Sequence, residues 1–219
     1  MITLEDVKKD PEVCCFIEMA NAHLGAMGYT EHSFRHVELV ANKAREIMSK
    51  FGNDQRLAEL AAIAGYLHDI GNVVSRYNHS QVGALLAHKI LTRLGMDCRE
   101  AALIMGAIGN HDEEEGQIVN EITAALVLAD KTDVHRARVR NQDKATFDIH
   151  DRVNYAVEDA VVEVDQESRV VTLRLKINID MVPVIEYFEL FMIRLLMCRR
   201  AVAFINCQFS IIINGAKLL

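Results

Sequence analysis

Apolar residues with helical spacing fill the first two thirds of the chain. They recur every three to four positions, which is the period of a helix with one buried face. The clearest stripe is Val37, Val40, Ala41, Ala44, Ile47 and Met48. The pattern predicts helices over residues 10–25, 30–50, 55–70, 79–94, 99–109 and 121–130, with a turn over 51–54.

Two helix ends can be predicted in more detail. Thr30 is a suitable N-cap for the helix over 30–50, which would place His32 and His36 one turn apart on the same face. Gly71 is expected to adopt the left-handed conformation that commonly ends a helix. His68 and Asp69 would then lie in the last turn of the helix before it.

The pattern changes near Phe147. Residues 155–164 and 169–177 are rich in β-branched residues, alternate in part between apolar and polar, and flank a polar turn. This combination is typical of a hairpin. A long apolar helix over 181–204 and a short strand over 208–213 are predicted to follow.

These elements predict a mainly α fold in two parts. Residues 1–145 would form a helical bundle, and residues 146–219 a small α+β region with the order β-β-α-β. The long C-terminal helix is apolar enough to bury against the core or against a second subunit. Because exposed sheet edges often pair, a homodimer is expected.

Composition narrows the class of protein. Hydrophobic residues make up 51% of the 219 residues, enough for a sizeable core. The net charge of −7 argues against stable nucleic-acid binding, whose affinity depends on neutralising phosphates. Charged residues interrupt the apolar stretch over 181–206, so no membrane span is expected. Five cysteines without a CxxC pair, and no secretory signal, predict a cytoplasmic setting.

The strongest candidates for functional residues are His68 and Asp69, a histidine and an aspartate that follow an apolar run in the sequence GYLHDIGN. A buried imidazole or carboxylate loses solvation unless it is paired or coordinated. The pair is therefore interpreted as half of a metal site. Further candidates lie at helix ends or beside apolar stripes, and the full set is His36, His68, Asp69, His79, His111 and Asp130. Imidazole and carboxylate together suit iron, manganese, nickel or zinc.

Five segments in this order resemble the HD-domain metal-dependent phosphohydrolase superfamily: RHVELVA, LHDIGN, NHSQVGA, GNHDE and LVLADK. The resemblance covers about residues 30–140. It implies an HD-type helical core that cleaves a phosphate ester or anhydride, with a small phosphorylated compound such as a nucleotide as the candidate substrate.

The resemblance also implies a role for each residue. His36, His68, Asp69 and Asp130 would hold one divalent transition metal. His79 and His111 would hold a second, with Asp69 bridging the two. A metal-bound hydroxide would attack phosphorus in line. Asp69, His111 and Lys131 are the expected catalytic residues, and His32, Arg76 and Lys131 the expected substrate contacts.

Several of these assignments have alternatives. His32 could replace His36 as the first ligand; His36 is favoured because it leads the apolar stripe. Lys131 is either a phosphate contact or a solvated surface lysine. Asp133, three residues after Asp130, competes with it for the late ligand position.

Three further residues near the candidate ligands have expected roles. Asp112 is a candidate to orient a ligand by hydrogen bonding. Glu114 and Glu115 are interpreted as a solvated loop. His88 is predicted to face away from the site, because it lies about 180° around its helix from His79.

Two other functions fit the same residues. Some HD relatives are di-iron oxygenases, which would keep the metals and change the reaction. A non-catalytic module that binds a nucleotide or a metal is the second alternative.

Overall fold

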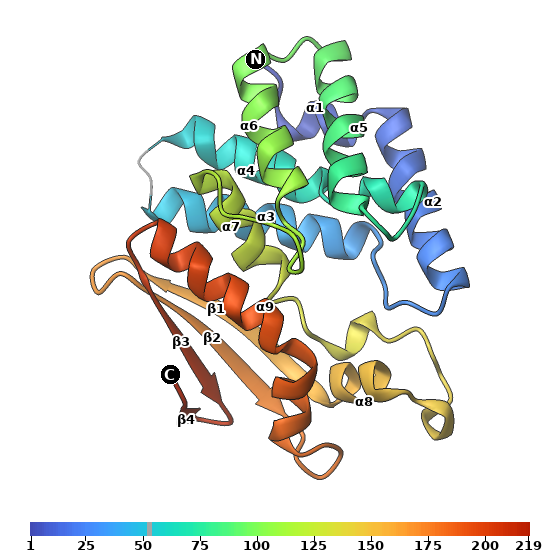
Figure 1. Ribbon diagram of the computed structural model, residues 1–219, viewed down its shortest axis with the longest axis vertical. Helices are drawn as coiled ribbons and strands as arrows, with labels where there is room; N and C mark the ends of the chain where they lie inside the picture. The colour runs from blue at the N-terminus through green and yellow to red at the C-terminus, as the bar shows by residue number, and fades with distance from the viewer. Residues whose placement is uncertain (52–53) are drawn as a thin grey trace.

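The computed structural model describes residues 1–51 and 54–219 (Figure 1). The predicted turn at 51–54 includes residues 52 and 53, which lie outside the described residues. The helices before the sheet are α1 (Leu4–Lys8), α2 (Pro11–Ala26), α3 (Phe34–Phe51), α4 (Gln55–Leu67), α5 (His79–Arg93), α6 (Cys98–Gly109), α7 (Glu121–Asp130) and α8 (Ile149–Ala156). Short 3-10 turns lie at Ile70–Val73, Arg136–Arg138 and Lys144–Thr146.

Helix α4 is the centre of the helical part. It contacts α3, α6 and α7, and every residue from Leu60 to Leu67 is buried. An almost wholly apolar run such as Leu60–Leu67 can be buried on all sides only if other helices surround it. The chain therefore carries His68 and Asp69 into the middle of the helical part.

The start of α3 differs from the prediction. The helix begins at Phe34, so Thr30 is not its N-cap, and His32 precedes the helix. Ser33 lies at the helix start instead, where its carbonyl oxygen accepts from the backbone N–H of Val37 (3.2 Å). The carbonyl oxygen of Thr30 accepts from Nδ1 of His32 (2.8 Å), a contact within the loop that local capping rules do not describe.

Helix α4 also ends differently. It stops at Leu67, and the chain continues through His68 and Asp69 into the 3-10 turn Ile70–Val73. Gly71 does not have a positive φ, so the predicted left-handed exit is wrong. A glycine is present there because the backbone of α5 lies directly against it. Gly95, in contrast, does end α5 with a φ of 88°.

The C-terminal region contains the predicted β-β-α-β order. Its elements are β1 (Val157–Asp165), β2 (Val170–Ile177), α9 (Val184–Phe204), β3 (Gln208–Ile213) and the short β4 (Ala216–Lys217). Strand β2 pairs antiparallel with β1 and parallel with β3, which returns after the α9 crossover. The first predicted strand begins two residues later than expected, because α8 occupies 149–156. The mainly α fold with a small C-terminal sheet is confirmed.

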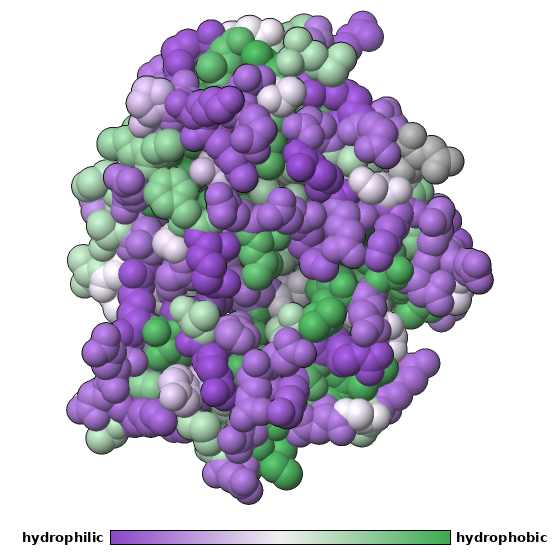
Figure 2. Space-filling model, turned by 180° about the vertical axis from the view of Figure 1, so that it is seen from behind, coloured by the Kyte–Doolittle hydropathy of each residue, from purple (hydrophilic) through white to green (hydrophobic). Residues whose placement is uncertain are grey.

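Helix α9 lies across one face of the sheet (Figure 1) and also contacts α7 of the helical part. This packing joins the two parts of the chain, and the proposed boundary at residue 145 stays a prediction. The side of the molecule opposite to Figure 1 is largely hydrophilic, with small scattered hydrophobic patches (Figure 2). Among the described helices, none is long and apolar enough to cross a membrane.

Candidate metal centre

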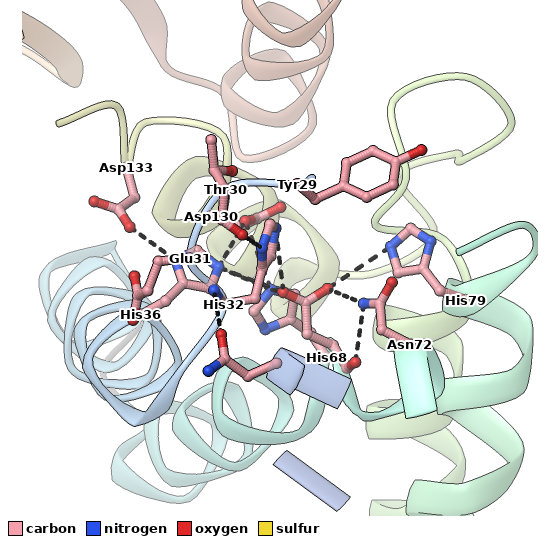
Figure 3. Close-up of polar contacts among 12 residues, drawn as sticks. Tyr29, Thr30, Glu31, His32, His36, His68, Asn72, His79, Asp130 and Asp133 are labelled. Atoms are coloured by element: carbon pink, nitrogen blue, oxygen red, sulfur yellow. Dashed lines mark hydrogen bonds and ion pairs between the residues drawn. The ribbon is translucent and has the colours of Figure 1, made fainter. Parts of the chain in front are cut away.

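The six predicted ligands meet in the interior of the helical part, and Figure 3 labels His36, His68, His79 and Asp130 among them. His36 comes from the first turn of α3, and His68 and Asp69 follow α4. His79 is the first residue of α5, His111 follows α6, and Asp130 is the last residue of α7. Each of the six is at most 8% exposed. Five segments that are distant in sequence therefore place polar side chains in one buried volume.

The closest contacts join His36, His68, Asp69 and Asp130. The two Nε2 atoms of His36 and His68 are 3.3 Å apart. Oδ1 of Asp130 lies 3.4 Å from Nε2 of His36 and 3.6 Å from Nε2 of His68. Oδ2 of Asp69 lies 3.6 and 3.2 Å from the same two nitrogens. Atoms that share one zinc-sized ion at about 2.1 Å lie roughly 3–3.5 Å apart, so the group His36, His68 and Asp130, whose ligand atoms all lie within 4.8 Å of one another, could hold one cation.

Asp69 also reaches toward the remaining histidines. Its Oδ1 lies 3.8 Å from Nε2 of His79. The ring of His111 lies between the rings of His68 and His79, with centroid distances of 5.0 Å to each. His68, Asp69 and His111 each offer a ligand atom within 4.8 Å of the others. The two oxygens of Asp69 therefore point to two adjacent ligand groups, as a bridging carboxylate would.

The histidines are held so that Nε2 faces the centre. In three of them Nδ1 donates to the backbone carbonyl oxygen three residues earlier: His68 to Gly65 (2.8 Å), His79 to Arg76 (3.1 Å) and His111 to Ile108 (2.6 Å). Because Nδ1 carries the proton, the lone pair of the neutral ring lies on Nε2. The same local arrangement thus prepares three separate ligands.

The orientation of His36 depends on Asp133 instead. Nδ1 of His36 donates to Oδ2 of Asp133 (2.7 Å), which also accepts from Arg35 (3.1 Å). Burial opposes ionisation of Asp133, but the hydrogen bond from His36 and the charge of Arg138 hold its pKa well below the usual range. The sequence suggested Asp133 as a rival of Asp130; in the structure it supports a candidate ligand.

We expect Asp133→Asn to lower the metal affinity of the protein by about 10- to 100-fold, the usual effect of removing a carboxylate that orients a histidine ligand. Asparagine has the same shape as aspartate, but it lacks the negative charge on the oxygen that accepts from Nδ1 of His36. Metal titration of the metal-free protein measures the change. Asp159→Asn, at an exposed position on β1, is the control and should leave the affinity unchanged. Equal affinities for both variants would contradict this role.

Charge in the centre is balanced by protons when no cation is present. Burial by itself would lower the pKa of His68, but the carboxylates of Asp69 and Asp130 outweigh it and raise that pKa to about 10. Burial lowers the pKa of His111 well below its usual value, and that of His79 to a lesser degree, so both rings stay neutral near pH 7. A cation that binds here must displace the proton of His68.

One buried carboxylate oxygen gives the most direct indication that a cation binds in the centre. Oδ2 of Asp69 is buried and accepts no hydrogen bond of good geometry among the described residues, although Nε2 of His68 lies 3.2 Å from it. A buried carboxylate oxygen without a good hydrogen bond is costly. The other oxygen is satisfied, because Nδ2 of Asn72 donates to it (2.9 Å). The donor set and this buried oxygen fit a bound divalent metal. Asn72 had no signal in the sequence.

Lys131 is buried, so its interpretation as a solvated lysine is wrong. Its Nζ lies 2.8 Å from Oδ2 of Asp130 and 2.6 Å from Oε2 of Glu113. Glu113 in turn accepts from Nε of Arg194 on α9 (3.0 Å). The chain Asp130–Lys131–Glu113–Arg194 thus connects the centre to the C-terminal region. Glu113 was part of an acidic run in the sequence, which gave no indication of this contact.

The predicted substrate contacts lie at the edge of the centre. Nε2 of His32 is 4.0 Å from Oδ2 of Asp69 and accepts from Arg138 (2.9 Å), so His32 is less close to the cluster than His36. Nη1 of Arg76 is 3.4 Å from Nε2 of His79. Asp112 lies 3.9 Å from Nδ1 of His79, too far for a hydrogen bond.

Two cavities open beside the centre and share Tyr29, Arg76, Glu113 and Glu114 in their linings. One of about 280 Å³ is lined by His79. The other, of about 400 Å³, is lined by His32 and by Phe191 and Arg194 of α9. The volume of the second is within the range of small-molecule sites, and its walls come from both parts of the chain.

Comparison with known proteins identifies a family and a relative. The family model described as "HD domain" matches residues 33–153, more than half of the chain. The chain is also 28% identical over 169 residues to the uncharacterized protein MJ1020 of Methanocaldococcus jannaschii. That alignment covers 67% of this chain and 65% of the length of the relative.

Proposed function

The chain belongs to the HD domain family, whose members are generally metal-dependent hydrolases, and on that premise we propose that it hydrolyses a phosphate ester or anhydride. The observation that carries the proposal is the position of Asp69. Its Oδ2 faces His36 and His68 and accepts no hydrogen bond of good geometry among the residues that the structure describes. Its Oδ1 faces His79. This arrangement supports a site with two divalent metals.

We propose that these metals are iron, manganese, nickel or zinc, because imidazole nitrogens form most of the donor set. When bound, such a pair would polarise a phosphoryl oxygen and lower the pKa of a coordinated water. His36, His68, Asp69 and Asp130 would hold one metal, and His79, His111 and Asp69 the other. Lys131 would position Asp130, since it binds the oxygen that faces away from His36 and His68.

The remaining residues would bind the substrate. Arg76 lies between the two cavities, next to His79, with its guanidinium over the ring of Tyr29 (5.6 Å), and would contact a phosphoryl group. His32 would contact the same group from the opposite side of Asp69. The 400 Å³ cavity would receive the rest of the substrate, with Phe191 available for an apolar or aromatic part and Asp148 and Asp151 for hydroxyl or amino groups. A nucleotide satisfies these requirements.

Elemental analysis of the purified protein, combined with a hydrolysis screen over nucleotides and phosphomonoesters, tests the proposal. We expect a transition metal to copurify, turnover to disappear after chelation, and turnover to return when the metal is restored. Protein that loads with metal but releases no phosphate from any of these compounds would contradict the proposed reaction. Oxygen consumption with a polyol or phosphonate, without phosphatase turnover, would indicate an oxygenase instead.

A further inference from the structure

Helix α9 has apolar residues on two opposite faces. The inner face is buried against the sheet and the helical part through Tyr187, Phe191, Leu195, Cys198 and Val202. On the opposite side, an outer stripe runs through Ile185, Glu189, Ile193, Leu196, Arg200 and Phe204, with the exposed Met192 and Ala203 beside it. The four apolar members of this outer stripe are 59%, 54%, 46% and 43% exposed, in chain order. Large apolar side chains gathered on one exposed face indicate an interaction site.

The outer stripe is symmetric about its own midpoint, between Arg194 and Leu195. Ile193 and Leu196 are equally distant from that point. So are Glu189 and Arg200, and so are Ile185 and Phe204. If two copies of α9 lay antiparallel across a two-fold axis at the midpoint, Ile193 would therefore face Leu196 and Ile185 would face Phe204.

The charges agree with this arrangement. In an antiparallel pair, Glu189 of each copy would face Arg200 of the other, so the opposite charges would meet twice. A parallel pair would place like charges opposite each other. Both residues are exposed, and neither forms an ion pair with any part of the chain that the structure describes. Their only complementary partners in this geometry belong to a second copy.

From the symmetric spacing and the unpaired charges, we propose that the outer stripe of α9 is the interface between two copies of this chain, which pack α9 against α9 in antiparallel orientation. Figure 1 shows α9 across the front of the molecule, where its outer face is accessible. Ile193 also lines the 400 Å³ cavity, so the second copy would lie at the rim of that cavity. The proposal does not depend on the reaction proposed above.

Charge reversal tests the interface. Sedimentation velocity of the full chain over a range of concentrations should show a monomer–dimer equilibrium. Glu189→Arg or Arg200→Glu alone should raise the dimer dissociation constant about ten-fold or more, because like charges would then meet at both symmetric positions. An equimolar mixture of these two single variants should dimerise as tightly as the original protein, since every charge again faces its opposite. The double variant should behave in the same way.

Glu18→Arg, at an exposed position on α2, is the matched control and should leave the dissociation constant unchanged. Three results would overturn the proposal. The first is a monomer at all concentrations. The second is a dimer that neither reversal weakens, which would indicate another face such as the free edge of β1. The third is weakening by both reversals without recovery in the mixture, because an antiparallel contact requires that recovery.

Discussion

Replacing Asp69 with alanine is expected to remove both metal binding and turnover. Asp69 is the residue whose two oxygens face both candidate ligand groups, so its loss weakens both sites together. We expect the metal content to fall close to zero. Hydrolysis should fall by about 10³-fold or more, because several kcal/mol of transition-state stabilisation depends on the metals. Elemental analysis and the phosphate-release assay measure the two effects.

His88→Ala is the control for this change. His88 lies on α5, the helix that begins with His79, but its side chain is exposed, as its position around the helix predicted. It should retain full metal content and activity. The free energies of unfolding of both metal-free variants show whether the fold persists. An Asp69→Ala protein that keeps its metal and its turnover would refute the proposed centre.

Four of the six candidate ligands could be predicted because each adjoins an apolar run or stripe, whereas His79 and His111 were predicted from their place in the whole set of segments that resembles the family. His68 and Asp69 close an apolar run, and Asp130 closes another, so burial could be inferred from the neighbouring residues alone. His36 leads an apolar stripe with helical spacing. Polar residues that their apolar neighbours place in the interior need a hydrogen-bond partner or a metal there. The spacing of apolar residues therefore predicted a metal site as well as the helices.

The residues that orient these ligands could not be predicted in this way. Glu113 meets Arg194 across 81 positions of sequence, and Asp133 meets His36 across 97. No period relates such pairs, because their distance is set by how whole helices pack. Thr30 is a second example: threonine can act as an N-cap, but the packing of the chain starts the helix at Phe34 instead. Local rules describe what a residue can do, and tertiary contacts decide which of those options is used.

Gly71 shows this most clearly, and substituting it has a large expected effect. A Cβ atom at this position would lie 2.0 Å from the carbonyl oxygen of His79 and 2.5 Å from the backbone nitrogen of Gly83. Both atoms belong to the backbone of α5, so no side-chain rotation can relieve the contact. Gly71→Ala should therefore lower the free energy of unfolding by about 3 kcal/mol, the upper part of the range for overpacking a core. Urea denaturation measures this loss.

The same change should also damage the centre, because the clash is with the residue that supplies a candidate ligand. Moving α5 outward withdraws His79 from Asp69, so we expect less bound metal per chain even where the variant remains folded. Gly106→Ala, within α6, is the matched control, since its Cβ would meet only the side chains of Val119 and Asn120, at 3.7 Å. Alanine there should stabilise the protein by up to about 1 kcal/mol. If Gly71→Ala were equally harmless, then α5 would not lie against the turn that follows Asp69, and His79 would have no fixed place in the site.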